Sequence, residues 1–220
     1  MENLSIQAAA AAFIAMSIQR WHTLMPDFGL SDNDSIYFEL VEAYSQKHRH
    51  YHTLDHLDAC LSHLDQVRKG IARAHEIELA LWFHDAVYDP HSCDNEIKSA
   101  EWATSFLRHN DVNSDVIDRV YSLIMATVHD AEPKRSDEAL LVDIDLAILR
   151  SKPSTFRKFE ADVRAEYKWV RTAIFKQRRR QILLSFLSRE RIFHTTYFYE
   201  NYEGQARENI AWAVARLGSS

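Results

Sequence analysis

The stretch LWFHDAVYDP, residues 81–90, places His84 beside Asp85 at the end of an apolar, aromatic-rich run. Removing an imidazole and a carboxylate from water costs several kcal/mol unless each finds a polar partner. A cation is the most effective partner for such a pair. The pair therefore predicts a metal site, for which the rest of the chain must supply further ligands.

Two further histidines stand four residues apart in RHYHTLDHLDACL. On a helix, His52 and His56 would share one face, one turn from each other. Two imidazoles in this arrangement can hold one cation, or one can hold the cation while the other acts on a substrate. The spacing alone leaves both alternatives open, and it is also compatible with an ordinary helical face.

A third source of ligands is LLVDIDLAIL, which carries Asp143 and Asp145 in a strongly apolar run. Residues two apart on a helix point about 200° from each other, so only one of the two carboxylates can face a given cation. Two imidazoles and two carboxylates suit a divalent transition ion such as Mn, Fe, Co, Ni or Zn better than Ca or Mg. In the rival interpretation, each of these residues is an internal polar group that is satisfied without a metal.

The order of these motifs resembles that of the HD-domain superfamily of metal-dependent phosphohydrolases. RHYHTLDH, LALWFHDAVYD, DNEIKSA, LIMATVHD, LLVDIDLAIL, VRAEY and ARENI follow one another as they do in a bacterial subfamily described as predicted metal-dependent HD phosphohydrolases. Together they cover about residues 20–212. The ordered set is far more specific than the bare His-Asp pair.

The resemblance implies a single divalent transition metal ion with four protein ligands. The implied ligands are His56, His84, Asp85 and Asp145. Asp145 is preferred over Asp143 because the superfamily's last ligand precedes a leucine, as Asp145 does. The resemblance also leaves room for a second metal ion.

Two further histidines gain roles from the resemblance. His52 is similar to the histidine that protonates the leaving oxygen in the cyclic-nucleotide phosphodiesterase branch, and the alternative is that it only lines the pocket. His129, in ATVHD, falls where some members recruit an extra histidine for a second metal. Contact with a substrate phosphate is the commoner alternative for His129.

The expected chemistry is hydrolysis of a phosphate ester. A bound cation lowers the pKa of its water from about 15.7 to about 7 and draws charge off a phosphoryl oxygen. Asp89 and Glu96 are the candidates for orienting that water. Each has an alternative role: Asp89 could close its helix before a proline, and Glu96 could complement the dipole of its helix.

Phosphate oxygens that do not touch the metal need donors, for which the arginine fork is the best match. Arg49 is the nearest arginine to His52 in the sequence, whereas Arg178 would have to arrive through the fold. Arg178 belongs to FKQRRRQ, whose three arginines fan out by 100° steps on a helix. At most one or two of them can face a pocket.

We therefore expect an enzyme that hydrolyses a small phosphorylated metabolite, with a nucleotide the leading class. Monoester, diester and pyrophosphate substrates all stay open. The alternative is a non-catalytic, metal-stabilised helical protein that binds a nucleotide or a partner. A third alternative is an HD protein with non-phosphate hydrolytic or oxygenase chemistry, which needs two metals.

The elements that position these residues are expected to be helices. The chain has only four Gly and four Pro, and they fall between apolar-periodic stretches. The predicted helices cover about residues 4–24, 34–46, 53–69, 74–87, 94–109, 114–128, 136–150, 154–166, 168–188 and 205–217. We predict an all-α fold in which residues 1–220 form one compact helical bundle of the HD-domain type.

Composition restricts the partners and the compartment. A net charge of −6 gives no general attraction to polyphosphate backbones, so nucleic acid is not expected as the main partner. Cys60 and Cys93 form no CxxC motif, which indicates neither a disulfide framework nor a thiolate zinc site and fits a reducing cytoplasm. AAAAAFIAMSI resembles a signal-peptide core, but it follows an acidic start and is too short to span a bilayer. We expect it to form the first helix, and we expect no membrane partner.

Overall fold

The computed structural model of the protein describes residues 17–218, and every regular element in this range is a helix. The predicted all-α class is confirmed. The chain divides into two compact units, with the boundary between Ala131 and Glu132. The organisation of residues 1–220 as one HD-type bundle stays a prediction. None of the helices within residues 17–218 has the length and apolar character that crossing a membrane requires.

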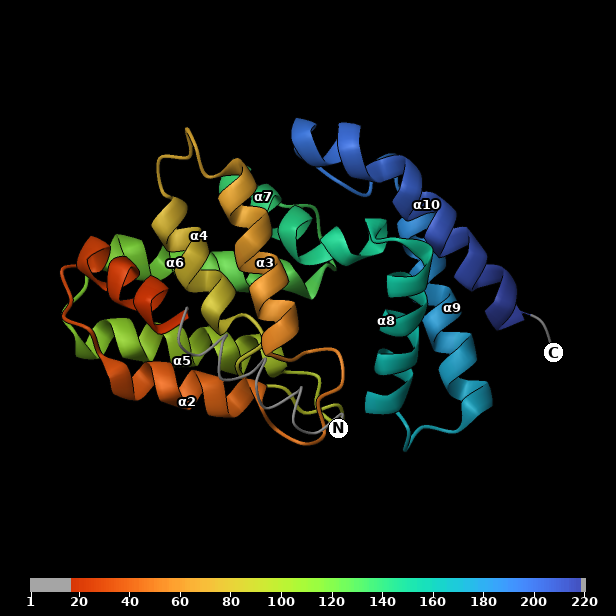
Figure 1. The fold of residues 1–220 in the computed structure, drawn as a ribbon, viewed down its shortest axis with the longest axis horizontal. Helices are drawn as coiled ribbons and strands as arrows, with labels where there is room; N and C mark the ends of the chain where they lie inside the picture. The colour runs from red at the N-terminus through yellow and green to blue at the C-terminus, as the bar shows by residue number, and fades with distance from the viewer. Residues whose placement is uncertain (1–16, 219–220) are drawn as a thin grey trace. The chain divides into compact units, whose positions relative to one another are not determined.

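The central helix of the first unit is α4 (Ala74–Phe83), which contacts α3 (Leu54–Val67), α5 (Asn95–His109) and α6 (Ser114–Met125) (Figure 1). Nine of its ten residues are buried. A helix whose residues are nearly all buried is typical of a protein interior, where neighbouring helices cover every face. Its two buried glutamates, Glu76 and Glu78, are paired with arginines. The sequence ELALWF that ends this helix therefore leads directly from the core to the His-Asp pair.

The other elements of the first unit complete this core. They are a helix over residues 17–24, η1 (Met25–Phe28), α2 (Asp34–Tyr44) and η2 (Ala126–Val128). The ring of Trp21 lies 5.5 Å from the ring of Trp82 in an edge-on contact, and Tyr37 packs 5.9 Å from Trp82. Of the predicted first helix, residues 4–16 lie outside the described residues.

Within residues 132–218, the second unit contains five helical elements. They are α7 (Ser136–Asp145), η3 (Leu146–Arg150), α8 (Pro153–Glu166), α9 (Thr172–Ser188) and α10 (Thr196–Gly218). In this unit α10 packs along α9 and η3 (Figure 1). The fully buried Asp143 accepts hydrogen bonds of 2.7 Å from the backbone N–H groups of His194 and Thr195. The α7 helix is thereby tied to the residues that lead into α10.

The predicted start of the last helix is wrong. It begins at Thr196 instead of about residue 205, and Gly204 lies inside it instead of preceding it. The residues TYFYENYEG have low helix propensity because of their aromatic side chains and the glycine. Tertiary packing outweighs this preference, since the buried rings of Phe198 and Tyr202 lie 4.7 Å apart, one helical turn from each other.

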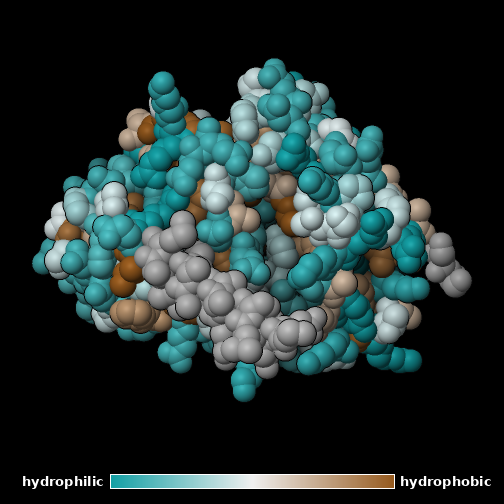
Figure 2. Space-filling view, viewed as in Figure 1, coloured by the Kyte–Doolittle hydropathy of each residue, from teal (hydrophilic) through white to brown (hydrophobic). Residues whose placement is uncertain are grey.

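The surface is mostly hydrophilic, as expected for helices whose apolar residues face the protein interior. Hydrophilic residues cover most of the face seen in Figure 2. The large apolar side chains that remain exposed come from separate parts of the chain, among them Phe38 and Trp169. Such isolated side chains are normal on a protein surface.

Candidate metal centre

The first candidate ligand is His56, which is buried on α3. The helix begins at Leu54, so His52 precedes it and the predicted sharing of one helical face by the two histidines is wrong. The two rings nevertheless lie 6.1 Å apart, because the turn before the helix brings His52 back toward His56. His52 is half-buried and therefore keeps access to solvent.

The end of α4 positions His84 and Asp85. The helix ends at Phe83, before the predicted end at residue 87, and both residues lie in the turn that follows. Adjacent side chains inside a helix would diverge by about 100°. In the turn they converge instead, with His84 Nε2 3.1 Å from Asp85 Oδ2.

A backbone carbonyl fixes the orientation of His84. Its Nδ1 atom lies 2.8 Å from the carbonyl oxygen of Leu81. Since a carbonyl can only accept, Nδ1 carries a proton, and in the neutral ring Nε2 has the lone pair. Metal-binding histidines are commonly prepared in this way, with the second nitrogen donating to a carbonyl or a carboxylate.

Three ligand atoms of the first unit converge on one point. His56 Nε2 and His84 Nε2 lie 3.2 Å apart, and Asp85 Oδ2 lies 3.4 Å from His56 Nε2. Two nitrogens at about 2.0–2.1 Å from one tetrahedral cation would be roughly 3.3 Å apart. The distances therefore match a shared ion, and the residues present fit a metal.

The charge state of Asp85 also suits a ligand. Burial raises the pKa of this carboxyl, but the imidazoles of His84, His52 and His56, which attract the carboxylate when they carry a proton, outweigh burial and hold the pKa well below its ordinary value. The carboxylate is therefore ionised at neutral pH and can bind a cation without first losing a proton.

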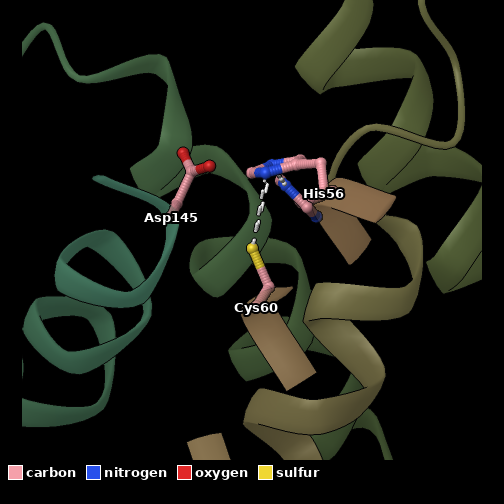
Figure 3. A group of neighbouring side chains, drawn as sticks. His56, Cys60 and Asp145 are labelled. Atoms are coloured by element: carbon pink, nitrogen blue, oxygen red, sulfur yellow. Dashed lines mark hydrogen bonds between the residues drawn. The ribbon is translucent and has the colours of Figure 1, made fainter. Parts of the chain in front are cut away.

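Cys60 is a fourth candidate, which reasoning from the sequence missed. It is buried one turn after His56 on α3, and its Sγ atom lies 3.8 Å from each ring nitrogen of His56 (Figure 3). One ligand atom from each of His56, Cys60 and His84 lies within 4.8 Å of the others, so these three residues could hold a metal ion. The four-residue spacing of His56 and Cys60 on a predicted helix was the signal that could have found it.

The remaining predicted ligand belongs to the second unit. Asp145 is the last residue of α7 and is half-buried. Its neighbour Asp143 uses both carboxylate oxygens on the residues before α10, with Oδ1 bound to the N–H of His194 and Oδ2 bound to the N–H and hydroxyl of Thr195. Asp143 is thus a structural residue, and metal binding by Asp145 stays a prediction.

His52 lies beside the cluster in an aromatic environment. Its ring stacks on Tyr88 at 4.2 Å with an angle of 28° between the planes, and the ring of Tyr51 lies 4.9 Å away on edge. These contacts restrict the orientation of a side chain that otherwise sits in a loop. Its role as a proton donor stays a prediction.

Arg49 is buried, and its guanidinium binds backbone carbonyls. Nη1 donates to the carbonyl oxygens of His52 at 3.0 Å and Asp85 at 2.7 Å, and Nη2 donates to that of Ala86 at 2.9 Å. Arg49 therefore ties the loop that carries His52 to the turn that carries Asp85. We interpret it as a residue that positions the site, and phosphate contact by Arg49 stays a prediction.

The two predicted water-orienting residues lie after α4. Asp89 is exposed and accepts a 2.9 Å hydrogen bond from the N–H of His91, which closes a local turn. Because α4 ends at Phe83, Asp89 lies in the loop that follows this helix. Glu96 is half-buried in the first turn of α5, where a carboxylate complements the helix dipole. The catalytic roles of both residues stay predictions.

The two predicted phosphate contacts other than Arg49 lie farther along the chain. His129 follows η2 in a left-handed backbone conformation with φ 58° and is half-buried. Arg178 is exposed on α9 of the second unit, and its Nη1 lies 3.5 Å from the side-chain oxygen of Gln181. Binding of phosphate by either residue stays a prediction.

Among known proteins, no family model, no curated protein and no solved structure matches this chain. A function is therefore inferred from the geometry of its own side chains and from the order of its motifs.

Proposed function

We propose that the protein is a metal-dependent phosphohydrolase of the HD-domain type. The observation that carries this proposal is the convergence of His56, His84 and Asp85, whose ligand atoms lie between 3.1 and 3.4 Å from one another. The order of the motifs along the chain supports the same function. A buried cluster of two imidazoles and an ionised carboxylate is costly to maintain without a cation.

His56, His84 and Asp85 would hold the ion, and Asp145 is proposed as a further ligand from the resemblance. A divalent transition ion held there would act as a Lewis acid on a phosphoryl oxygen and would lower the pKa of a water molecule. The mixed nitrogen and oxygen donors fit Mn, Fe, Co, Ni or Zn.

The rest of the chemistry falls to side chains around the ligands. His52 is proposed to donate a proton to the leaving oxygen, a role that its ring contacts and partial exposure support. Its ring lies 6.1 Å from that of His56, close enough for one phosphate ester to touch both regions. Asp89 and Glu96 are proposed for water orientation, and Arg178 and His129 for phosphate contact.

We propose a small phosphorylated metabolite as the substrate, with a nucleotide the leading class, and a cytoplasmic location for the protein. Support for the location comes from the two cysteines, which are both free thiols. Free thiols are typical of reducing compartments.

The test compares phosphate release by matched variants. The full chain is stripped with a chelator, loaded with Mn, Co, Ni or Zn, and given a panel of nucleotide monoesters, cyclic diesters and pyrophosphates. The wild type should release phosphate. Asp85→Asn should lose both the metal and the activity, because it removes a charged ligand. Asp58→Asn, an exposed position on α3, makes the same charge change and should retain both.

Loaded protein that binds one ion per chain and releases no phosphate from any compound would overturn the proposal. It would favour the alternative of a metal-stabilised protein that binds a nucleotide or a partner without turnover. Two ions per chain by elemental analysis would favour the chemistry that needs a pair of metals.

A further inference from the structure

We infer that Cys60 is a thiolate ligand of the metal ion, and that the centre is therefore a soft-metal site that selects Zn or Co over Mn. This inference rests on the metal centre of the proposed function and names the donor set of that same site. Figure 3 shows the sulfur of Cys60 directed toward the imidazole of His56, one turn earlier on α3.

The distances carry the first step. Cys60 Sγ lies 3.8 Å from His56 Nε2, and His56 Nε2 lies 3.2 Å from His84 Nε2. With metal–sulfur and metal–nitrogen bonds of about 2.3 and 2.0–2.1 Å, a tetrahedral ion would hold sulfur and nitrogen roughly 3.6 Å apart. The observed distance of 3.8 Å between Cys60 Sγ and His56 Nε2 is close to this value.

Charge balance carries the second step. The two imidazoles are neutral when they bind a metal, and Asp85 contributes one negative charge. In a buried centre, negatively charged ligands offset the charge of a divalent ion. A thiolate from Cys60 would be one such ligand, since a metal ion deprotonates a coordinating thiol outright.

The chemistry of sulfur carries the third step. Thiolate ligands favour Zn and other soft ions, whereas centres made only of carboxylate and imidazole accept Mn as well. A buried cysteine is otherwise a small apolar residue. An experiment can distinguish a metal ligand from an apolar core residue, because only the ligand forms a bond to the metal.

Cobalt reports that bond directly. The chelator-stripped, reduced full chain is titrated with Co(II), and its near-ultraviolet spectrum is recorded for a thiolate-to-cobalt charge-transfer band. The Cys93→Ser variant is the decisive protein, because Cys60 is then its single cysteine and Cys93 is exposed. We expect the band in the wild type and in Cys93→Ser, and its loss in Cys60→Ser.

Metal competition supplies a second readout. With a chromophoric chelator as competitor, Cys60→Ser should weaken Zn binding by more than about ten-fold, because a direct ligand contributes at least as much as an outer-shell partner. Mn binding should change by less than about three-fold, since Mn gains little from sulfur.

Co(II) that binds to Cys93→Ser without the charge-transfer band would overturn the inference, and so would a failure of Co(II) to bind. These results do not depend on the folding of any Cys60 variant. The band together with no phosphate release from the substrate panel would keep the inference and reject the proposed function. Phosphate release without the band would do the reverse.

Discussion

Arg49 Nη1 donates a 2.7 Å hydrogen bond to the carbonyl oxygen of Asp85, so a buried guanidinium holds the backbone of a candidate metal ligand. The same nitrogen binds the carbonyl of His52, and the guanidinium lies 5.3 Å from the ring of Tyr88. Carbonyl dipoles and the face of an aromatic ring replace the water that a buried cation loses. The geometry of the centre therefore depends in part on a guanidinium that binds the backbone around a candidate ligand.

The substitution Arg49→Lys should destabilise the first unit and loosen the centre. A lysine ammonium is a compact group without the planar fork of a guanidinium, so it cannot bind the three carbonyls together. We expect the free energy of unfolding to fall by about 2–4 kcal/mol, measured in urea. Co(II) affinity should fall as well. The exposed Arg178→Lys should change stability by less than about 0.5 kcal/mol. Equal stability and affinity in Arg49→Lys and wild type would rule out the positioning role.

The substitution His52→Ala should keep the metal and slow turnover. Loss of a positioned acid typically costs about 10²–10⁴ in kcat. The loss should shrink for an aryl ester whose leaving group needs no proton, which separates an acid from a residue that only lines the pocket. Steady-state rates on both substrates and metal content per chain check this. Loss of the metal in the variant would instead make His52 a ligand.

The free energy of unfolding should fall as the pH rises from 10 to 12, because Tyr44 is buried. Its burial raises the pKa of the phenol from about 10 to about 12. The folded state therefore keeps a proton that the unfolded state has released, so unfolding is favoured progressively as pH rises through this range. The stabilising effect, up to about 2–3 kcal/mol, is complete below pH 10 and lost near pH 12.

Urea unfolding at pH 8, 10 and 11.5 tests this against Tyr44→Phe. The variant should be about 1 kcal/mol less stable at pH 8, because the N–H of Asp85 loses the hydroxyl as its acceptor, and this difference should shrink at high pH. Tyr121→Phe, at an exposed position, should follow the wild-type profile. Parallel curves for the wild type and Tyr44→Phe would contradict the prediction.

Substitutions of Asp143 and of Asp145 should affect different properties, namely stability and metal binding. Asp143→Ala removes the acceptor of three hydrogen bonds, from two N–H groups and the hydroxyl of Thr195, and should lower the free energy of unfolding by about 2–4 kcal/mol. Its metal content should not change. Asp145→Asn should lose metal affinity with little loss of stability. Elemental analysis and thermal unfolding of both variants check this, and the reversed pattern would reassign the ligand.

Periodicity predicted the helices, but their ends depended on contacts that lie outside the local sequence. The α4 helix ends at Phe83 because the N–H of Asp85 turns to the hydroxyl of Tyr44, which lies 41 residues earlier. The α10 helix starts at Thr196 because its aromatic side chains are buried by the fold. The contact between Asp85 and Tyr44 lies outside any window of ten residues, and the burial of the α10 aromatic side chains depends on elements elsewhere in the chain.

The candidate centre was predictable where residues of a metal-binding type stand in an apolar stretch of sequence, as His84 and Asp85 do. The roles of Arg49 and Cys60 were not inferred. The carbonyls that Arg49 binds at Asp85 and Ala86 are backbone atoms, to which any residue type contributes equally. Cys60 was considered only for cysteine motifs, so its spacing from His56 was overlooked.

The hydrogen bond between His84 Nδ1 and the Leu81 carbonyl requires a fixed number of residues between Leu81 and His84. Inserting or deleting one residue between the two positions would rotate the imidazole by about 100° around the helix axis. Volume-preserving substitutions of the residues between Leu81 and His84 would leave the orientation of the imidazole unchanged. The segment therefore tolerates changes of residue type but not insertions or deletions.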